Sequence, residues 1–362
     1  MTKPLLAVAV AAALPALAQA QTNVTLSGNF KTGVAQTKYS NGATNNGNHT
    51  ALADGSSRFI ISGSEDLGGG LKALFQVDNR FKVDDGTQSI AGGNTFLGLA
   101  GGFGTIRLGK LDLYHNLGLD EFQGRAVAHQ HSNEGILSYI NGNAIARASR
   151  AQNVVRYDLP RLGGLRGGLA WSPGAVGTEG AVGDAQKGNA WEADLAYASG
   201  PFTVGAAFWD EKFEGYKTAA AGTSIGQQSW RVYGAYHFGI VKVGLTYDDS
   251  KLKFEGTGDQ KRAAWSIPVS AKLGPGTLLF TYSQAADLKV GGSKSSDTGA
   301  RLIALGYDYP LSKRTSLGVS YAAVDNDRNA TYRYYSLSAG NLSAPVAGQD
   351  QKQFYVGLRH AF

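Results

Sequence analysis

Three short stretches of the chain hold residues that could act on a ligand. Residues 104–110 (GTIRLGK) follow the pattern of a phosphate-binding loop up to its lysine, but Leu111 replaces the magnesium-binding hydroxyl and the segment alternates like a strand. Residues 325–329 (DNDRN) are similar to a calcium loop, with Ala330 in place of the required glycine. His129 and His131 could share a metal but lack an evident third ligand. These motifs predict no nucleotide, metal or cofactor site, and a cation site at 325–329 is the weaker alternative.

The chemistry that the sequence does offer is electrostatic. Lys+Arg number 34 against 28 Asp+Glu, which gives a formal net charge of +6, and the charges are interspersed rather than gathered in blocks. Interspersed cations disfavour binding of nucleic acid and leave a lipid surface or an anion path. No serine and histidine occur in a pattern typical of a nucleophilic site, so we predict no catalytic residues and no enzyme. The chain has no cysteine, which excludes disulfides and thiolate metal sites.

The first twenty residues have the three parts of a secretory signal. Lys3 is followed by an apolar run over residues 5–14 and by the tripeptide AQA, which ends at residue 20. The run is too short to span a membrane. We therefore expect residues 1–20 to be cleaved and residues 21–362 to be exported. No later apolar run is long enough for a membrane helix, so a mature protein in a membrane must be a closed barrel.

The dominant pattern after residue 23 is an alternation of apolar and polar side chains, interrupted by glycine-rich turns. It places sixteen strands, at residues 24–34, 57–63, 71–83, 94–100, 104–110, 152–159, 164–172, 190–199, 201–213, 229–238, 241–254, 263–273, 277–287, 299–309, 314–325 and 353–362. Short turns alternate with long polar loops, as in outer-membrane barrels with an even strand number. The sequence thus predicts one all-β domain, a transmembrane 16-stranded antiparallel β-barrel.

Residues 111–150 are the longest irregular connection, and they carry apolar side chains of their own. A connection of this length is usually functional or disordered, and its apolar content favours packing. We interpret it as a loop folded into the mouth of the barrel, where it narrows the bore. The loop contains the acidic pair Asp120 and Glu121, and Arg150 lies where it rejoins the wall.

The apolar positions also indicate which charges face the lumen. The polar inner faces of the first six strands carry Lys31, Arg58, Lys72, Arg80, Arg107 and Arg156. Fixed guanidinium charge in a narrow bore raises the local anion concentration and opposes cations. If Asp120 and Glu121 face this wall, they set up a transverse field across the opening. The structural alternative for each arginine is a wall charge paired with a carboxylate.

Five stretches together carry a resemblance to a known family. They are SRF at 57–59, GSEDLGGGLKA at 63–73, GLAGGFGTIRLGK at 98–110, NVVRY at 153–157 and GLRHAF at 357–362. In this order they resemble the general porins of Gram-negative outer membranes, especially the trimeric sixteen-stranded type of beta-proteobacteria. The resemblance implies a homotrimer surrounded by lipid and lipopolysaccharide, with a constriction made by the third extracellular loop. It also implies passive diffusion of small hydrophilic solutes and inorganic anions.

The resemblance extends to single positions. Arg58 and Arg150 match basic positions in the opening of anion-selective members, and Asp78 matches an acidic position of the wall. Phe362, at the end of an alternating strand, resembles the signal read by the outer-membrane assembly machinery. Asn94 stands where such members can carry a further arginine, which implies a milder anion selectivity.

Three alternatives belong to other functional classes. A channel specific for one anionic solute would show a ladder of aromatic side chains in the lumen, and the inner faces offer few, such as Tyr233 and Tyr355. A plugged structural barrel or adhesin would carry apolar-tipped outer loops, whereas these loops are rich in Asn, Gly and Ser. An outer-membrane hydrolase would need a nucleophile paired with a base, and no serine and histidine in this sequence occur in such a pattern. General diffusion is therefore the preferred prediction.

Overall fold

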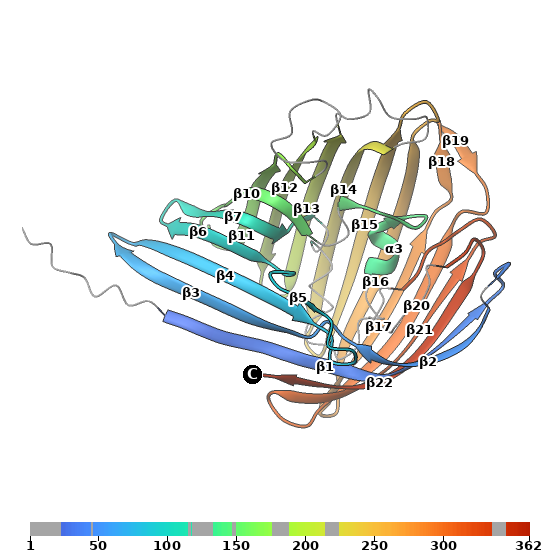
Figure 1. The fold of residues 1–362 in the computed structure, drawn as a ribbon, viewed down its shortest axis with the longest axis horizontal. Helices are drawn as coiled ribbons and strands as arrows, with labels where there is room; N and C mark the ends of the chain where they lie inside the picture. The colour runs from blue at the N-terminus through green and yellow to red at the C-terminus, as the bar shows by residue number, and fades with distance from the viewer. Residues whose placement is uncertain are drawn as a thin grey trace, which may run out of the picture.

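The computed structural model describes residues 23–44, 46–114, 117, 133–146, 150–175, 188–213, 224–334 and 345–362. The expected signal at residues 1–20 lies outside the described residues. Antiparallel strands make up most of the described chain and form one ring-shaped wall (Figure 1). Within the described ranges, no helix has the length and apolar character needed to cross a membrane.

Sixteen long strands build the wall, as the alternation predicts. They are β1 (Asn23–Ser40), β3 (Arg58–Gly68), β4 (Leu71–Phe81), β6 (Thr95–Gly101), β7 (Gly104–Asp112), β10 (Arg150–Asp158), β11 (Leu165–Ser172), β12 (Gly188–Ser199), β13 (Phe202–Phe213), β14 (Ser224–Phe238), β15 (Val241–Phe254), β16 (Gln260–Leu273), β17 (Gly276–Ala285), β20 (Ala300–Pro310), β21 (Thr315–Asn326) and β22 (Asp350–Ala361). Each pairs antiparallel with the next long strand along the chain.

The remaining elements lie in the connections. β2 (Gly47–Asp54), β5 (Gln88–Ser89), β18 (Leu288–Val290) and β19 (Ser293–Ser295) extend the hairpins of the wall, and α3 (Glu134–Leu137), β8 (Tyr139–Ile140) and β9 (Asn143–Ala144) belong to residues 111–150. The sequence analysis ends the first strand at residue 34 and begins the next at residue 57, and this was wrong in part, because β1 continues to Ser40 and pairs with β2. A hairpin that extends beyond a bilayer contacts water on its outer face and therefore carries polar side chains there. Its sequence then lacks the alternation of apolar and polar residues by which a strand is recognised.

The wall closes on itself where the first strand meets the last. β1 pairs with β22 from Asn29 opposite Ala361 to Ser40 opposite Asp350, and Figure 1 shows the blue β1 beside the red β22. Beyond this ladder, Gly28 and Phe362 exchange two backbone hydrogen bonds, of 3.1 and 3.2 Å between N and O. The Phe362 ring lies on the outer wall near Phe30, with the ring centres 6.0 Å apart. Among the described strands, closure gives each long strand a neighbour on both sides.

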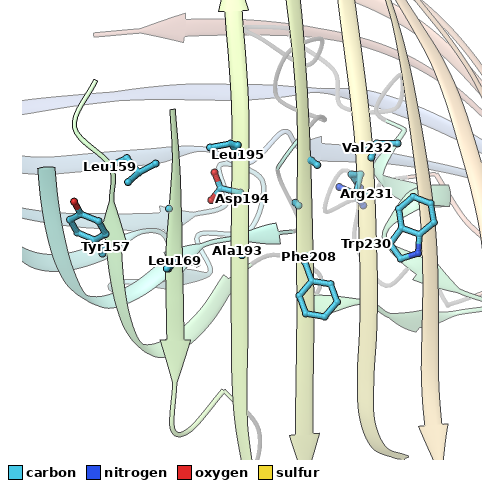
Figure 2. Close-up of a pocket in the computed structure, with 13 residues that line it drawn as sticks. Tyr157, Leu159, Leu169, Ala193, Asp194, Leu195, Phe208, Trp230, Arg231 and Val232 are labelled. Carbon is cyan, nitrogen blue, oxygen red and sulfur yellow. The ribbon is translucent and has the colours of Figure 1, made fainter. Parts of the chain in front are cut away.

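The two faces of the wall differ in polarity as predicted. On β14, Trp230 and Val232 point outward and are 42% and 44% exposed, whereas the intervening Arg231 is 1% exposed. The outer face of β11 to β14 forms an apolar hollow, lined mainly by Leu169, Leu195, Phe208, Trp230 and Val232 (Figure 2). A wall that is apolar outside and polar inside is the arrangement of a transmembrane barrel.

Aromatic side chains mark the outer wall and one of its rims. Trp171 and Trp191 are register partners on β11 and β12, with ring centres 6.0 Å apart. Near the short turns, the Tyr157 hydroxyl donates to the Phe103 carbonyl (2.6 Å) and the Tyr307 hydroxyl to the Leu273 carbonyl (2.9 Å). Aromatic rings that carry a polar group at one end, as Tyr and Trp do, are suited to the boundary between hydrocarbon and water.

We expect Gly28→Ala to reduce the fraction of chain that refolds into a closed barrel. A methyl group there would lie 2.8 Å from the Phe362 ring and would collide with the Arg58 carbonyl oxygen, so the seam must shift. Gel mobility of unheated samples after refolding in detergent measures this fraction. Gly234→Ala is the control, because its added methyl meets only the Thr203 oxygen, at 3.6 Å. Equal refolding of the two variants would contradict the role of Gly28.

Candidate functional site

A group of charges occupies the inner wall at the long-loop end of β3 and β4. Arg58 and Arg80 are register partners, and Asp78 lies between their side chains. The Asp78 Oδ2 atom accepts from Arg80 Nη2 at 2.8 Å and from Arg58 Nη1 at 3.5 Å. The Asp78 carboxylate is 2% exposed, whereas the Arg58 side chain is 37% exposed. One buried carboxylate thus orients two guanidinium groups, of which Arg58 reaches furthest into the water.

Arg150 completes this group from the start of β10. Its Nε atom lies 3.2 Å from the Oδ1 atom of Asp112, the last residue of β7. The charges of Arg150 and Arg58 both act on the Arg80 guanidinium. We call Arg58, Arg80 and Arg150, with Asp78 and Asp112, the upper arginine group. Among the described residues, three guanidinium groups thus share two carboxylates, so cationic groups outnumber anionic ones in this part of the wall.

Arg107 and Arg156 belong to a second, separate group on β7 and β10. The Arg107 Nη2 atom lies 2.6 Å from Asp158 Oδ2. Arg156 contacts three carboxylates, with 2.7 Å to Asp158, 2.6 Å to Glu192 and 2.5 Å to Asp194. The Arg156 side chain is only 9% exposed, so its charge is largely balanced in place. We call these five residues the lower ion-pair group.

Glycine at position 168 allows Arg156 to reach its partners. β11 lies between β10, which carries Arg156, and β12, which carries Glu192 and Asp194. The guanidinium passes over Gly168, where an added Cβ would lie 2.6 Å from Arg156 Nη2. The structure thus brings Arg107 and Arg156 together with carboxylates and apart from Arg58.

Lys72 does not join either group. It lies at the short-turn end of β4, opposite Asp66 in the register, and is exposed. Eight residues separate it from Arg80, which corresponds to roughly 26 Å along an extended strand. The alternation along β4 indicates which face Lys72 lies on, but it does not indicate the position of Lys72 along the barrel axis.

The described parts of residues 111–150 cross the lumen. They leave the wall at β7 and return at β10, yet Tyr114 donates a hydrogen bond of 2.7 Å to Asp248 on β15. Between β7 and β15 the ring contains β10, β11, β12, β13 and β14. The helix α3 packs further on, against β16, β17 and β20 (Figure 1). The described parts of this connection therefore lie inside the barrel.

A buried carboxylate anchors this inserted segment to the far wall. Asp248 accepts from Arg231 on β14 at 2.9 Å and lies 3.2 Å from Arg262 on β16, and all three side chains are fully buried. Arg231 also donates to the Leu117 carbonyl (3.0 Å), and Arg262 donates to the Leu137 carbonyl (3.0 Å). We call Tyr114, Arg231, Asp248 and Arg262 the anchor cluster. It fixes the backbone of the segment at two points.

Residues after β21 pack on the same segment. The backbone N–H of Thr331 donates to Asn141 (2.7 Å), and the Arg333 guanidinium lies 5.0 Å above the Tyr139 ring. Tyr334 is buried and donates to Thr37 of β1 at 3.4 Å. Two connections, far apart in the sequence, therefore narrow the barrel together.

Sequence reasoning missed the anchor cluster. The alternation places Arg231 on an inner face, but no local signal marks Asp248 or Arg262 as its partners. Asp120 and Glu121, the carboxylates expected opposite the arginine wall, lie outside the described residues, as do His129 and His131.

Comparison with known proteins decides the family. The model of the Gram-negative porin family matches residues 6–330 of the chain. The chain belongs to the Gram-negative porin family. Outer membrane porin protein 32 of Delftia acidovorans is 31% identical over 385 residues, and the match covers 100% of both chains. The major outer membrane protein P.IB of Neisseria sicca is 27% identical, again over 100% of both.

A solved structure shares both fold and sequence with this porin. The anion-selective porin from Comamonas acidovorans superposes with a TM-score of 0.74 and 26% identity, and the match covers 94% of this chain and 100% of that one. The porin is thus a multi-pass β-barrel of the outer membrane that forms a channel for passive diffusion.

We expect Asp248→Asn to release the inserted segment of the porin. The change removes the carboxylate charge that pairs with two buried guanidinium groups, and breaking such a pair typically costs about 3–5 kcal/mol. Single-channel recording in planar bilayers should show a larger and noisier conductance. Asp259→Asn is the control, since Asp259 is 40% exposed and pairs only with Lys251 at 2.6 Å among the described ion pairs. Unchanged conductance in the Asp248 variant would show that the anchor cluster does not hold the segment.

Proposed function

We propose that this porin favours anions over cations, and that the upper arginine group is the filter. The observation that carries the proposal is the exposure of Arg58, which is more than one-third, beside Arg80 and Arg150; among the described residues these three arginines share two carboxylates. Walls of low dielectric constant concentrate the field of fixed charges in a bore, so a small excess acts strongly on passing ions. The similar Comamonas porin, described as anion-selective, supports the proposal.

We infer a moderate selectivity from the role of Asn94. Its side-chain oxygen accepts a hydrogen bond of 2.7 Å from the backbone N–H of Asp112, and Asp112 in turn pairs with Arg150. A neutral amide therefore stands beside the filter and supports it, without adding positive charge. Asp120 and Glu121 on the inserted segment belong to the same proposal, as the carboxylates that complete a transverse field.

The assembly in the membrane is also part of the proposal. A homotrimer surrounded by lipid and lipopolysaccharide is supported by the family, and an outer membrane protein of Vibrio cholerae with the same fold is described in a trimer form. Small hydrophilic solutes and inorganic anions would be the solutes that diffuse through the channel. Phe362 would be the residue read by the outer-membrane assembly machinery, because its backbone and ring lie at the seam where the barrel closes.

We expect Arg58→Ala combined with Arg150→Ala to lower the permeability ratio of chloride to potassium. The double variant turns the charge of the filter from an excess of cations to an excess of carboxylates. The reversal potential under a KCl gradient measures the ratio. Lys251→Ala with Lys261→Ala is the matched control, because these two lysines lie on the outward side of β15 and β16. An unchanged reversal potential in the arginine variant would exclude the upper arginine group as the filter.

Removal of Phe362 should impair insertion more than conduction. The deletion takes away the two hydrogen bonds to Gly28 and the ring beside Phe30, but no lumenal group. We expect a reduced amount of protein in outer-membrane fractions and a normal conductance in the channels that do form. Normal membrane levels would contradict the role of Phe362.

A further inference from the structure

The lumen wall contains a cavity of about 980 Å³ between the short turns and the inserted segment. It begins at the turns that join β6 to β7 and β10 to β11, where Gly102 and Arg161 line it, and it extends to Leu117 of the inserted segment. A volume of this size is within the range of sites for small molecules, roughly 300–1,000 Å³. The cavity lies beside the lower ion-pair group and is distinct from the upper arginine group.

Four arginines and two aspartates line the cavity. Arg107 and Arg156 are held by Asp158 and Asp194, while Arg161 and Arg166 bring further positive charge at the short-turn end. Among the described lining residues there is no other carboxylate. Even when Glu192 behind the wall is included, four guanidinium groups face three carboxylates. Among the described residues at the cavity, the guanidinium groups therefore outnumber the carboxylates.

The same cavity has an apolar side, which is unusual for the inside of an aqueous channel. Leu74 and Phe96 lie on the inner faces of β4 and β6, and Leu117 approaches from the inserted segment. All three side chains are only partly buried. The Arg107 guanidinium lies 5.5 Å above the Phe96 ring, so cationic and aromatic surfaces are in direct contact. Apolar groups left in contact with water favour a ligand that covers them.

We propose that this cavity is a binding site for organic anions that carry a carboxylate at one end and a flat apolar body at the other. The carboxylate would lie at Arg161 and Arg166, and the apolar body would extend toward Phe96 and Leu117. The proposal rests on the anion selectivity proposed above, since the solute must first pass the upper arginine group. It adds a substrate class: aromatic carboxylates dwell in the channel longer than inorganic anions do.

The lower ion-pair group gives this site a rigid wall. Arg156 is fixed by its contacts with three carboxylates, and Arg107 by its contacts with Asp158. A preformed site loses little side-chain entropy on binding. The carboxylates that make the wall rigid also keep its charge modest, so a solute can leave as well as enter.

Current block by phenylpropionate tests the site. Phenylpropionate and propionate carry the same charge, and only the former has a ring, so each is titrated into single channels bathed in KCl. We expect phenylpropionate to reduce the chloride current in a saturable way and propionate to leave it nearly unchanged. Arg161→Gln with Arg166→Gln should raise the half-blocking concentration about tenfold, equivalent to about 1.4 kcal/mol of binding. Phe96→Leu should raise it several-fold, because it removes the ring and keeps an apolar side chain.

Controls separate the site from the filter. Lys313→Gln with Arg314→Gln makes the same charge change in the short turn between β20 and β21, away from the cavity, and should leave the block unchanged. The absence of a saturable block by phenylpropionate would overturn the proposal. A block that persists in the Arg161 and Arg166 variant but is lost in Arg58→Ala with Arg150→Ala would also overturn it and place the anion at the filter. The reversal potential of the unmodified channel, measured in the same membranes, tests the anion selectivity independently.

Discussion

The bilayer supplies no water to an unpaired backbone amide, and the structure depends on meeting that constraint at the seam between β1 and β22. Once these strands pair, every long strand has two neighbours, and the wall has an inside and an outside. Apolar side chains then face lipid, and charged ones gather in the lumen. The seam ends at a tight contact, in which Gly28 leaves room for the Phe362 ring and for the carbonyl of Arg58. Arg58, a member of the upper arginine group, is thus tied directly to closure.

Arginines of the lumen wall differ in the number of carboxylates that they contact, and this number separates two roles. Arg156 contacts three carboxylates and is nearly buried, so it mainly links β10 to β12 across β11. Arg58 shares the Asp78 carboxylate with Arg80, at a distance of 3.5 Å, and its side chain remains accessible to passing ions. The same residue type therefore acts as a structural tie at one depth and, in the function proposed above, as a filter at another.

The fold and part of the site could be predicted from sequence because a strand has a period of two. That period assigns Arg58, Arg80, Arg107 and Arg156 to the lumen without knowledge of neighbours. It does not give depth, because the stagger between strands decides which residues share a level. Hence Lys72 and Arg80 lie on one face of one strand but at opposite ends of it. The role of Asp248 could not be predicted from the sequence, because its partner Tyr114 lies far away in the chain and contacts it only across the lumen.

The contact between the two inward connections has a consequence for the order of assembly. Asn141 meets Thr331, and Thr37 meets Tyr334, so the opening is built from residues near both ends of the chain. Contacts with such large sequence separation form late in folding, because the loop-closure entropy must be offset first. The opening therefore reaches its final width only after the last strand has docked on the first.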